Sequence, residues 1–260
     1  MSNSTVLLER DGDVGRVTLN RPAQMNSITL TMNEELSAIL TRLEEDGSLR
    51  VVVLSGAGRA FCAGQDLNER ASMLRAGEVD LGRSLEHWYA PLILRFRALP
   101  VPVIAAVNGI AAGAGASIAL ACDIVVAARS ASFVQSFGKV GLVPDCGGTW
   151  FLPRLAGRAR ACALMMLAER TTAEDAERMG LIWKCVEDAR LAETVDSIAA
   201  QLKSFSPDAL RRSKQLLNES FDNTLEQQLS LEAHFQRDLG KTARYRESVL
   251  AFAEKRIPPS

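Results

Sequence analysis

Asp145 is a lone carboxylate in the segment GLVPDCGGTW (residues 141–150), where its neighbours are apolar residues and glycines. Pro144 favours a turn, aspartate is a favoured N-cap residue and an apolar helical pattern follows Gly148, so one interpretation is a turn and helix cap. The other is a general base, because apolar neighbours raise the pKa of a carboxylate that they enclose. Taken alone, the segment favours the cap, since caps are far commoner than catalytic bases.

Two glycine-rich segments upstream could bring backbone N–H groups to the same site. They are SGAGRAFCAGQDL (residues 55–67) and NGIAAGAGA (residues 108–116), and each follows a short apolar run that predicts a buried strand. Small residues let a main chain approach a ligand closely, and the first turn of a helix adds unpaired N–H donors. Such donors can bind a phosphate or a developing oxyanion. The alternative is that the small residues serve only close helix–sheet packing.

Several common catalytic motifs are absent from the sequence. Gly113-Ala114-Gly115 lacks the third glycine of a dinucleotide-binding GxGxxG, and no GxxxxGK[ST] is present. Ser117 does not lie in a GxSxG motif, and neither histidine has the context of a catalytic triad. Between residues 117 and 141 the one acid is Asp123, so a pair of glutamates for acid–base catalysis is missing.

The elements that must position these segments can be read from apolar periodicity. Strands alternate with helices up to about residue 190, which predicts an α/β core with largely parallel strands, and residues 191–260 are predicted to be a helical C-terminal part. The expected strands are a hairpin (6–8 and 14–19), 51–54, 103–107, 124–126 and 183–186. The expected helices begin after a cap at Thr29 or Thr31, near Ser84 and near Gly113, and they predominate after Gly148.

Composition narrows the class of protein. The 260 residues are 47% hydrophobic and 23% charged with a formal net charge of −1, which gives no reason to expect nucleic acid or an anionic membrane as a partner. The five cysteines are odd in number and widely spaced, and the first residues show no signal-peptide pattern, so we expect a cytoplasmic protein. With no CxxC pair and two histidines, we expect no metal site.

Longer motifs give the sequence a family resemblance. FCAGQDL (61–67), AAVNGIAAGAGASIALACDIVVA (105–127) and GLVPDCGGTWFLPRLAG (141–157) occur in order, and VGRVTLNRPAQMNSIT (14–29) precedes them. Together they resemble the enoyl-CoA hydratase/isomerase, or crotonase, family over nearly the whole chain. The resemblance implies a spiral of repeated ββα units, a helical C-terminal trimerisation region, homotrimers or dimers of trimers, and acyl-CoA thioester substrates. No separate cofactor is expected, because CoA is part of the substrate.

The resemblance also assigns roles to individual residues. The backbone N–H groups of Ala63 and Ala114 are expected to form an oxyanion hole for the thioester oxygen, with Asp145 as the acid/base. Ser117 and Phe137 stand where hydratases of the family carry glutamates, which favours isomerisation over water addition. A dehalogenase would need a tryptophan where Phe137 stands and an activating histidine, for which His87 is only loosely placed.

Residues expected near the CoA moiety are implied less directly by the same resemblance. They are Arg21, Gln24, Ala63, Gln65, Asp66, Leu67, Phe252 and Lys255, the last two reaching CoA in some members from the next subunit. For the arginine and the lysine a solvated surface charge is the alternative, and for Asp66 a helix cap. Among enzymes, the resemblance leaves open a Δ3,Δ2-enoyl-CoA isomerase of linear substrates and a hydratase-like enzyme on other acyl-CoAs. A non-catalytic CoA-ester binder and an RNA-binding relative also stay open, the last because of the basic cluster Arg211-Arg212-Ser213-Lys214.

Overall fold

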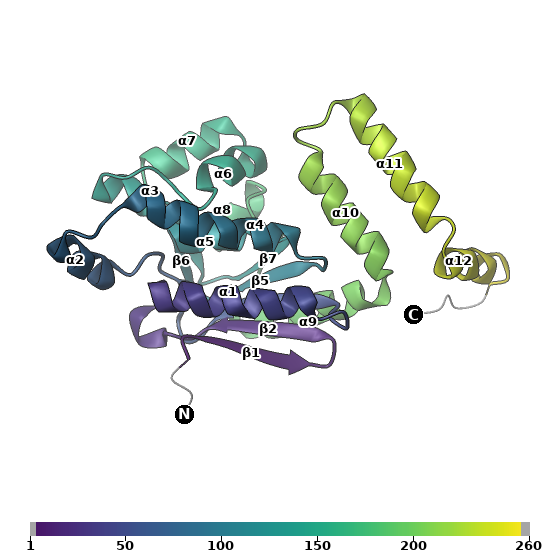
Figure 1. Cartoon of the computed structure of the whole chain (residues 1–260), viewed down its shortest axis with the longest axis horizontal. Coiled ribbons are helices and arrows are strands. Elements are labelled where there is room, and N and C mark those ends of the chain that lie inside the picture. Colours follow the sequence, from purple (N-terminus) through teal and green to yellow (C-terminus); the bar gives the residue numbers. More distant parts are fainter. Residues whose placement is uncertain (1–3, 256–260) are drawn as a thin grey trace.

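The computed structural model describes residues 4–255, and a six-stranded β-sheet lies at its centre (Figure 1). Its first two strands form an antiparallel hairpin and every other neighbouring pair is parallel. The hairpin and the four predicted strands are therefore confirmed, as is the α/β class. In spatial order the strands are β1 (Val6–Asp11), β2 (Val14–Leu19), β3 (Val51–Gly56), β5 (Val103–Val107), β7 (Ile124–Ala128) and β10 (Lys184–Val186).

A second sheet of four very short strands lies beside the first, and the apolar pattern alone did not predict it. Its strands, in spatial order, are β4 (Ala60–Cys62), β6 (Ile110–Ala112), β8 (Ser132–Val134) and β9 (Thr171–Thr172). Each of β3, β5 and β7 is followed along the chain by one strand of this small sheet, and then by a helical segment. This alternation is the repeated ββα unit that the family resemblance implies.

Helices cover the sheets and continue beyond them. Thr29 caps α1 by accepting a hydrogen bond from the Met32 N–H, which decides between the two predicted caps. The helix predicted near Ser84 is interrupted by a π-helical turn at Leu85–Tyr89. The α-helices are α1 (Leu30–Glu45), α2 (Leu67–Ala76), α3 (Leu81–Ser84), α4 (Ala90–Ala98), α5 (Ala114–Ala121), α6 (Gly148–Ala156), α7 (Arg158–Met166), α8 (Ala173–Arg178), α9 (Leu191–Ser204), α10 (Pro207–Glu219), α11 (Leu225–Leu239) and α12 (Ala243–Ala253).

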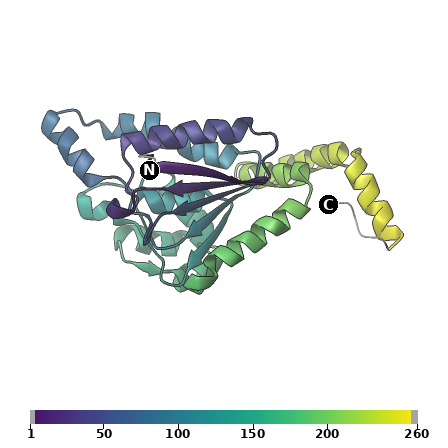
Figure 2. The ribbon, with the colours of Figure 1, turned by 90° about the horizontal axis from the view of Figure 1, so that it is seen from below.

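The boundary between core and helical part lies one helix later than predicted. Helix α9 packs on β3, β5 and β7, and its residues Leu191, Val195 and Ala199 are buried in the same core cluster as the strands. The helices that leave the core are α10, α11 and α12, which extend to one side in both views (Figures 1 and 2). The expected division at residue 190 is therefore wrong, because the apolar face of α9 completes the core.

The turn at the end of β2 is joined to the small sheet by one buried side chain. Asn26 adopts a left-handed backbone conformation (φ 55°), and its carboxamide oxygen accepts from the Arg21 N–H at 2.8 Å. Its Nδ2 donates to the carbonyl oxygens of Ala57, Ala60 and Phe61 at 2.9, 2.8 and 3.2 Å. The Asn26 side chain thus holds the start and the end of the β3–β4 connection to the turn.

We expect Asn26→Ala to lower the free energy of unfolding by about 2–3 kcal/mol, because buried carbonyl groups would lose their donor. Urea titration monitored by circular dichroism measures the change. Asn68→Ala is the control, since the Asn68 side chain is exposed and should change the free energy by less than about 0.5 kcal/mol. Equal effects of the two substitutions would contradict this role of Asn26.

Candidate active site

The two glycine-rich segments meet at the ends of β4 and β6. These strands pair in parallel, with Cys62 opposite Ala111, so the residues that follow them lie side by side. Gly64 has φ +88°, and a Cβ at that position would lie 2.7 Å from the Ala112 oxygen and 3.5 Å from the Ala114 nitrogen. A side chain would therefore clash with the second segment, which explains the glycine and brings the two sets of amides together.

Among the N–H groups at this junction, two that lie on the two segments have no hydrogen-bond acceptor within the part of the chain that the structure describes. They belong to Gln65 and to Ala114, the first residue of α5, whose N–H has no acceptor within the helix. By contrast, the Ala63 N–H donates to the Met25 oxygen at 3.0 Å. This corrects the prediction for Ala63: its amide belongs to the fold, and the free donor lies two residues later.

The Asp145 side chain does not cap a helix. The N-cap of α6 is Gly147, and no side chain caps that helix. Asp145 takes part in the turn through its main-chain oxygen, which accepts from the Gly148 N–H at 2.8 Å and from the Ser117 hydroxyl at 3.1 Å. Its Oδ1 atom is buried and has no hydrogen-bond partner within residues 4–255. The carboxylate therefore remains available for chemistry.

The environment of Asp145 makes it a stronger base than an ordinary aspartate. Burial raises the pKa of Asp145 above its usual 3.8, while a hydrogen bond from the Cys146 thiol and the positive charge of Arg70 act in the opposite direction. The same burial and the Asp145 carboxylate raise the pKa of Cys146 and keep its thiol protonated. Asp145 thus has a greater affinity for a proton than an ordinary aspartate.

Sequence analysis missed two further groups at the site, Arg70 and Tyr89. Tyr89 is buried in the π-helical turn, and its hydroxyl donates to the Gln65 Oε1 atom. Burial raises the pKa of Tyr89, the Asp145 charge raises it further, and the Arg70 charge lowers it. Arg70 lies one helical turn after Asp66, the N-cap residue of α2, and this four-residue spacing could have predicted that both side chains lie on the same face of the helix. No sequence pattern predicted the π-helical turn that carries Tyr89.

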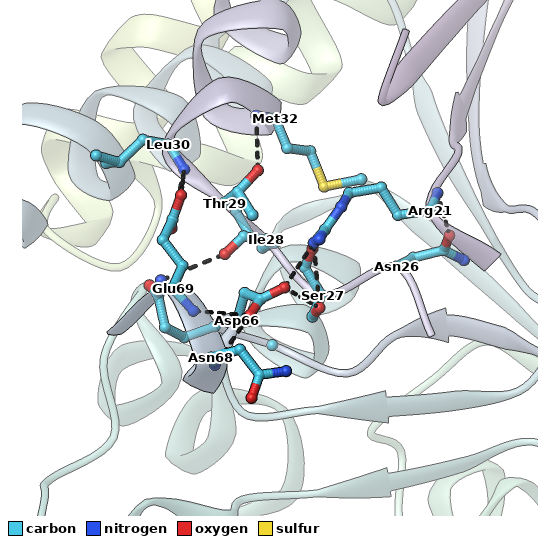
Figure 3. A network of polar contacts seen from close by, with 12 residues as sticks. Arg21, Asn26, Ser27, Ile28, Thr29, Leu30, Met32, Asp66, Asn68 and Glu69 are labelled. Atoms are coloured by element: carbon cyan, nitrogen blue, oxygen red, sulfur yellow. Dashed lines mark hydrogen bonds and ion pairs between the residues drawn. The ribbon is translucent and has the colours of Figure 1, made fainter. Parts of the chain in front are cut away.

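Arg21 and Asp66, both expected near CoA, are bound to each other inside the protein (Figure 3). The Arg21 Nη1 atom lies 2.8 Å from Asp66 Oδ2 and also donates to the Ser27 main-chain oxygen. Asp66 Oδ1 accepts from the Asn68 and Glu69 N–H groups, which confirms the helix-cap interpretation. The Ser27 hydroxyl also donates to Asp66 Oδ2 at 3.0 Å, and the network gives Arg21 and Asp66 a structural role beside the amide junction.

The other residues expected near CoA fall into two groups. Gln24 and Leu67 are exposed beside the Arg21–Asp66 network, which leaves them accessible to a ligand. Phe252 belongs to α12 and Lys255 lies just after it, and α12 is at the opposite end of the molecule from α2 in both views (Figures 1 and 2). Phe252 is 83% exposed. Within one chain these two residues do not reach the site, so a role in binding requires a second copy.

Ser117 and Phe137, which stand where hydratases of the family carry glutamates, have no carboxylate and contribute packing instead. Ser117 is fully buried against the Asp145 main chain, and the Phe137 ring lies 3.5 Å from the position that a Gly113 Cβ would take. His87 is exposed, with its Nδ1 atom 3.0 Å from the Arg83 oxygen one turn earlier. Its ring therefore lies on the surface of its own helical segment and is not directed at Asp145 by any contact.

Two other features of the surface do not point to a site. A hollow of about 910 Å³ lies between α10, α11 and α12, but it is an open gap beneath helices that extend away from the core, and Asp145 is not among its lining residues.

In the basic cluster, Lys214 is buried and pairs with Asp123 at 2.7 Å, Arg211 pairs with Asp208, and Arg212 stacks on Phe235. All three basic side chains of the cluster thus interact with other residues of the protein, which disfavours RNA binding. No helix within residues 4–255 has the length and apolarity to cross a membrane.

Comparison with known proteins agrees with this geometry. The family model described as enoyl-CoA hydratase/isomerase matches residues 9–259. The chain is 49% identical to a 1,2-epoxyphenylacetyl-CoA isomerase from Escherichia coli, over 97% of both chains, and 45% identical to a probable enoyl-CoA hydratase from Rhodobacter capsulatus, over 99% of this chain and 98% of the relative. A crystal structure of an enoyl-CoA hydratase from Bacillus anthracis superposes with a TM-score of 0.92 at 36% identity, covering 98% of both chains. The chain belongs to the enoyl-CoA hydratase/isomerase family.

Proposed function

We propose that the protein is an acyl-CoA isomerase in which Asp145 is the acid/base and the N–H groups of Gln65 and Ala114 form the oxyanion hole. The observation that carries the proposal is a buried carboxylate oxygen without a partner, in a site with two unpartnered amides. Ser117 and Phe137 supply no second carboxylate to activate water. One base and two fixed donors suit the movement of a proton between two carbons of one substrate.

The chemistry follows from the charges at the site. Asp145 removes a proton from the carbon next to the thioester carbonyl. The electron pair of that C–H bond forms a carbon–carbon double bond, and the π pair of the carbonyl group moves to its oxygen to give an enolate. The two N–H groups donate to this oxygen, and they are already oriented because the fold fixes them. The protonated Asp145 then returns the proton to a different carbon, so the base is regenerated and no atom is gained or lost.

The substrate that we favour is ring 1,2-epoxyphenylacetyl-CoA, converted to 2-oxepin-2(3H)-ylideneacetyl-CoA in aerobic phenylacetate catabolism. Besides the proton shift, this conversion breaks the carbon–carbon bond between the two epoxide carbons, and its electron pair becomes part of the double bonds of the seven-membered ring, so the product is an isomer of the substrate. The proposal is supported by the 49% identity to a protein named for isomerising that thioester. Shift of a double bond in a linear enoyl-CoA, from the β,γ to the α,β position, uses the same base and oxyanion hole and is the second candidate. A hydratase-like activity is the third, suggested by the 45% identical relative.

The proposal includes the assembly. Phe252 and Lys255 can contribute to CoA binding only from a neighbouring copy, and α10–α12 expose apolar side chains such as Leu217, Phe221 and Leu225. Burial of such surface drives association of subunits. We therefore propose a homotrimer or a dimer of trimers, which sedimentation analysis would distinguish from a monomer.

We expect Asp145→Asn to lower kcat for isomerisation about 10²–10⁴-fold, because the amide cannot accept the substrate proton. Binding of a substrate analogue, measured by calorimetry with phenylacetyl-CoA, should change less than about threefold. Asp222→Asn, at an exposed loop position, is the matched control and should retain full activity. An Asp145→Asn variant with most of its activity would refute the assignment of the base.

The pH profile gives a second measurement of the same residue. Because burial raises the pKa of Asp145, we expect kcat/KM to fall as pH decreases, with its inflection above 3.8. Cys146→Ala removes a thiol that lowers this pKa, so the inflection should move to higher pH. An inflection that stays in place in the Cys146→Ala variant would show that a different group controls the rate.

A further inference from the structure

The half-buried side chain of Arg70 carries one buried donor atom without a partner. Its Nη1 atom is shielded from solvent and has no hydrogen-bond partner within residues 4–255. A buried donor of a charged group without an acceptor destabilises a protein more than an unpaired neutral donor does. Such an atom is expected at a ligand site, where the missing acceptor arrives with the ligand.

Arg70 lies close to the Gln65 amide and to Asp145, where the acyl group of the proposed substrate would bind. Helix α2 starts directly after the Gln65 and Asp66 segment, and Arg70 follows one turn later, with its N–H bonded to the Asp66 oxygen at 3.0 Å. Its charge acts on Asp145 and on Tyr89, which places it among the groups around the base. Yet the Arg70 Nη1 and Asp145 Oδ1 atoms are both buried without a hydrogen-bond partner within residues 4–255, so these two atoms are not bonded to each other.

We propose that Arg70 is a specificity-determining residue that donates a hydrogen bond to an oxygen atom on the acyl group of the substrate. This inference rests on the proposed function. The thioester oxygen already has two backbone donors, so the acceptor for Arg70 must be a second oxygen. An acyl group that carries an ether, epoxide or hydroxyl oxygen satisfies Nη1, whereas a hydrocarbon acyl group leaves it buried and unpaired.

The size of the effect follows from the charge. Hydrogen bonds to charged groups contribute about 1.5–3 kcal/mol, which corresponds to roughly 10–100-fold in an equilibrium constant. The preference for an oxygenated acyl group should be of that size in the wild-type protein. A purely structural Arg70, or one that only adjusts the pKa of Asp145, would not distinguish two ligands that differ by one oxygen.

The test compares two stable thioesters, phenylacetyl-CoA and 2-hydroxyphenylacetyl-CoA, by calorimetry with the purified full-length protein. We expect the wild-type protein to bind the hydroxylated ester about 10–100-fold more tightly, and Arg70→Met to reduce that ratio to about one. Arg75→Met, five residues later on the exposed surface of the same helix, should keep the wild-type ratio. Arg70→Lys keeps a positive donor and should restore part of the preference.

The outcomes separate this inference from the proposed function. Equal binding of the two esters by the wild-type protein, or an unchanged ratio in a folded Arg70→Met variant, overturns the role of Arg70. Thermal unfolding of each variant shows whether it is folded; if Arg70→Met unfolds, the ratio in Arg70→Lys and Arg70→Gln decides. Failure of the proposed isomerisation would appear instead as absence of turnover while the binding preference persists.

Discussion

The hydrogen bonds of the Asn26 side chain are the constraint on which the site depends. Its amide group binds three carbonyl oxygens at both ends of the β3–β4 connection, and its oxygen holds the Arg21 N–H. These bonds fix the connection and the start of β4, and the Gln65 amide follows the end of β4, two residues after the Ala63 N–H donates to the Met25 oxygen. An oxyanion donor is useful only if it does not reorganise during the reaction, and this set of buried bonds supplies that rigidity.

The same turn orients the next element through a charged contact. Arg21 pairs with Asp66, and the Asp66 carboxylate also accepts from the first N–H groups of α2 (Figure 3). An acid at a helix N-terminus is stabilised by the helix dipole as well as by hydrogen bonds, and these bonds hold its pKa below the usual range against the effect of burial. The position of α2, and with it the side chain of Arg70, therefore depends on residues at the end of β2.

The parts of this protein that sequence predicts are those whose signal is local. Apolar runs such as residues 51–54 and 103–107 gave the strands of the larger sheet, and Thr29 gave a helix cap. The strands of the smaller sheet have two or three residues each, too few for a period to show, so they followed only from the family resemblance. The hydrogen-bond partner of each backbone N–H group could not be predicted either, because the Ala63–Met25 bond joins residues 38 positions apart in the sequence. Arg70 and Tyr89 lie near Asp145 through folding alone.

The main chain and the side chain of Asp145 have different effects on the stability of the fold. The turn uses its main-chain oxygen, which Ser117 and Gly148 bind, and any residue could supply that oxygen. The side chain contributes nothing comparable: its pKa is raised, so the ionised form is less stable in the folded protein than in the unfolded chain. Because the folded pKa lies above the unfolded one, this destabilisation is absent at low pH and complete once the pH exceeds the folded pKa. A carboxylate that makes the fold less stable at neutral pH, and makes no hydrogen bond through Oδ1, is explained physically by the acid/base role that we propose for it.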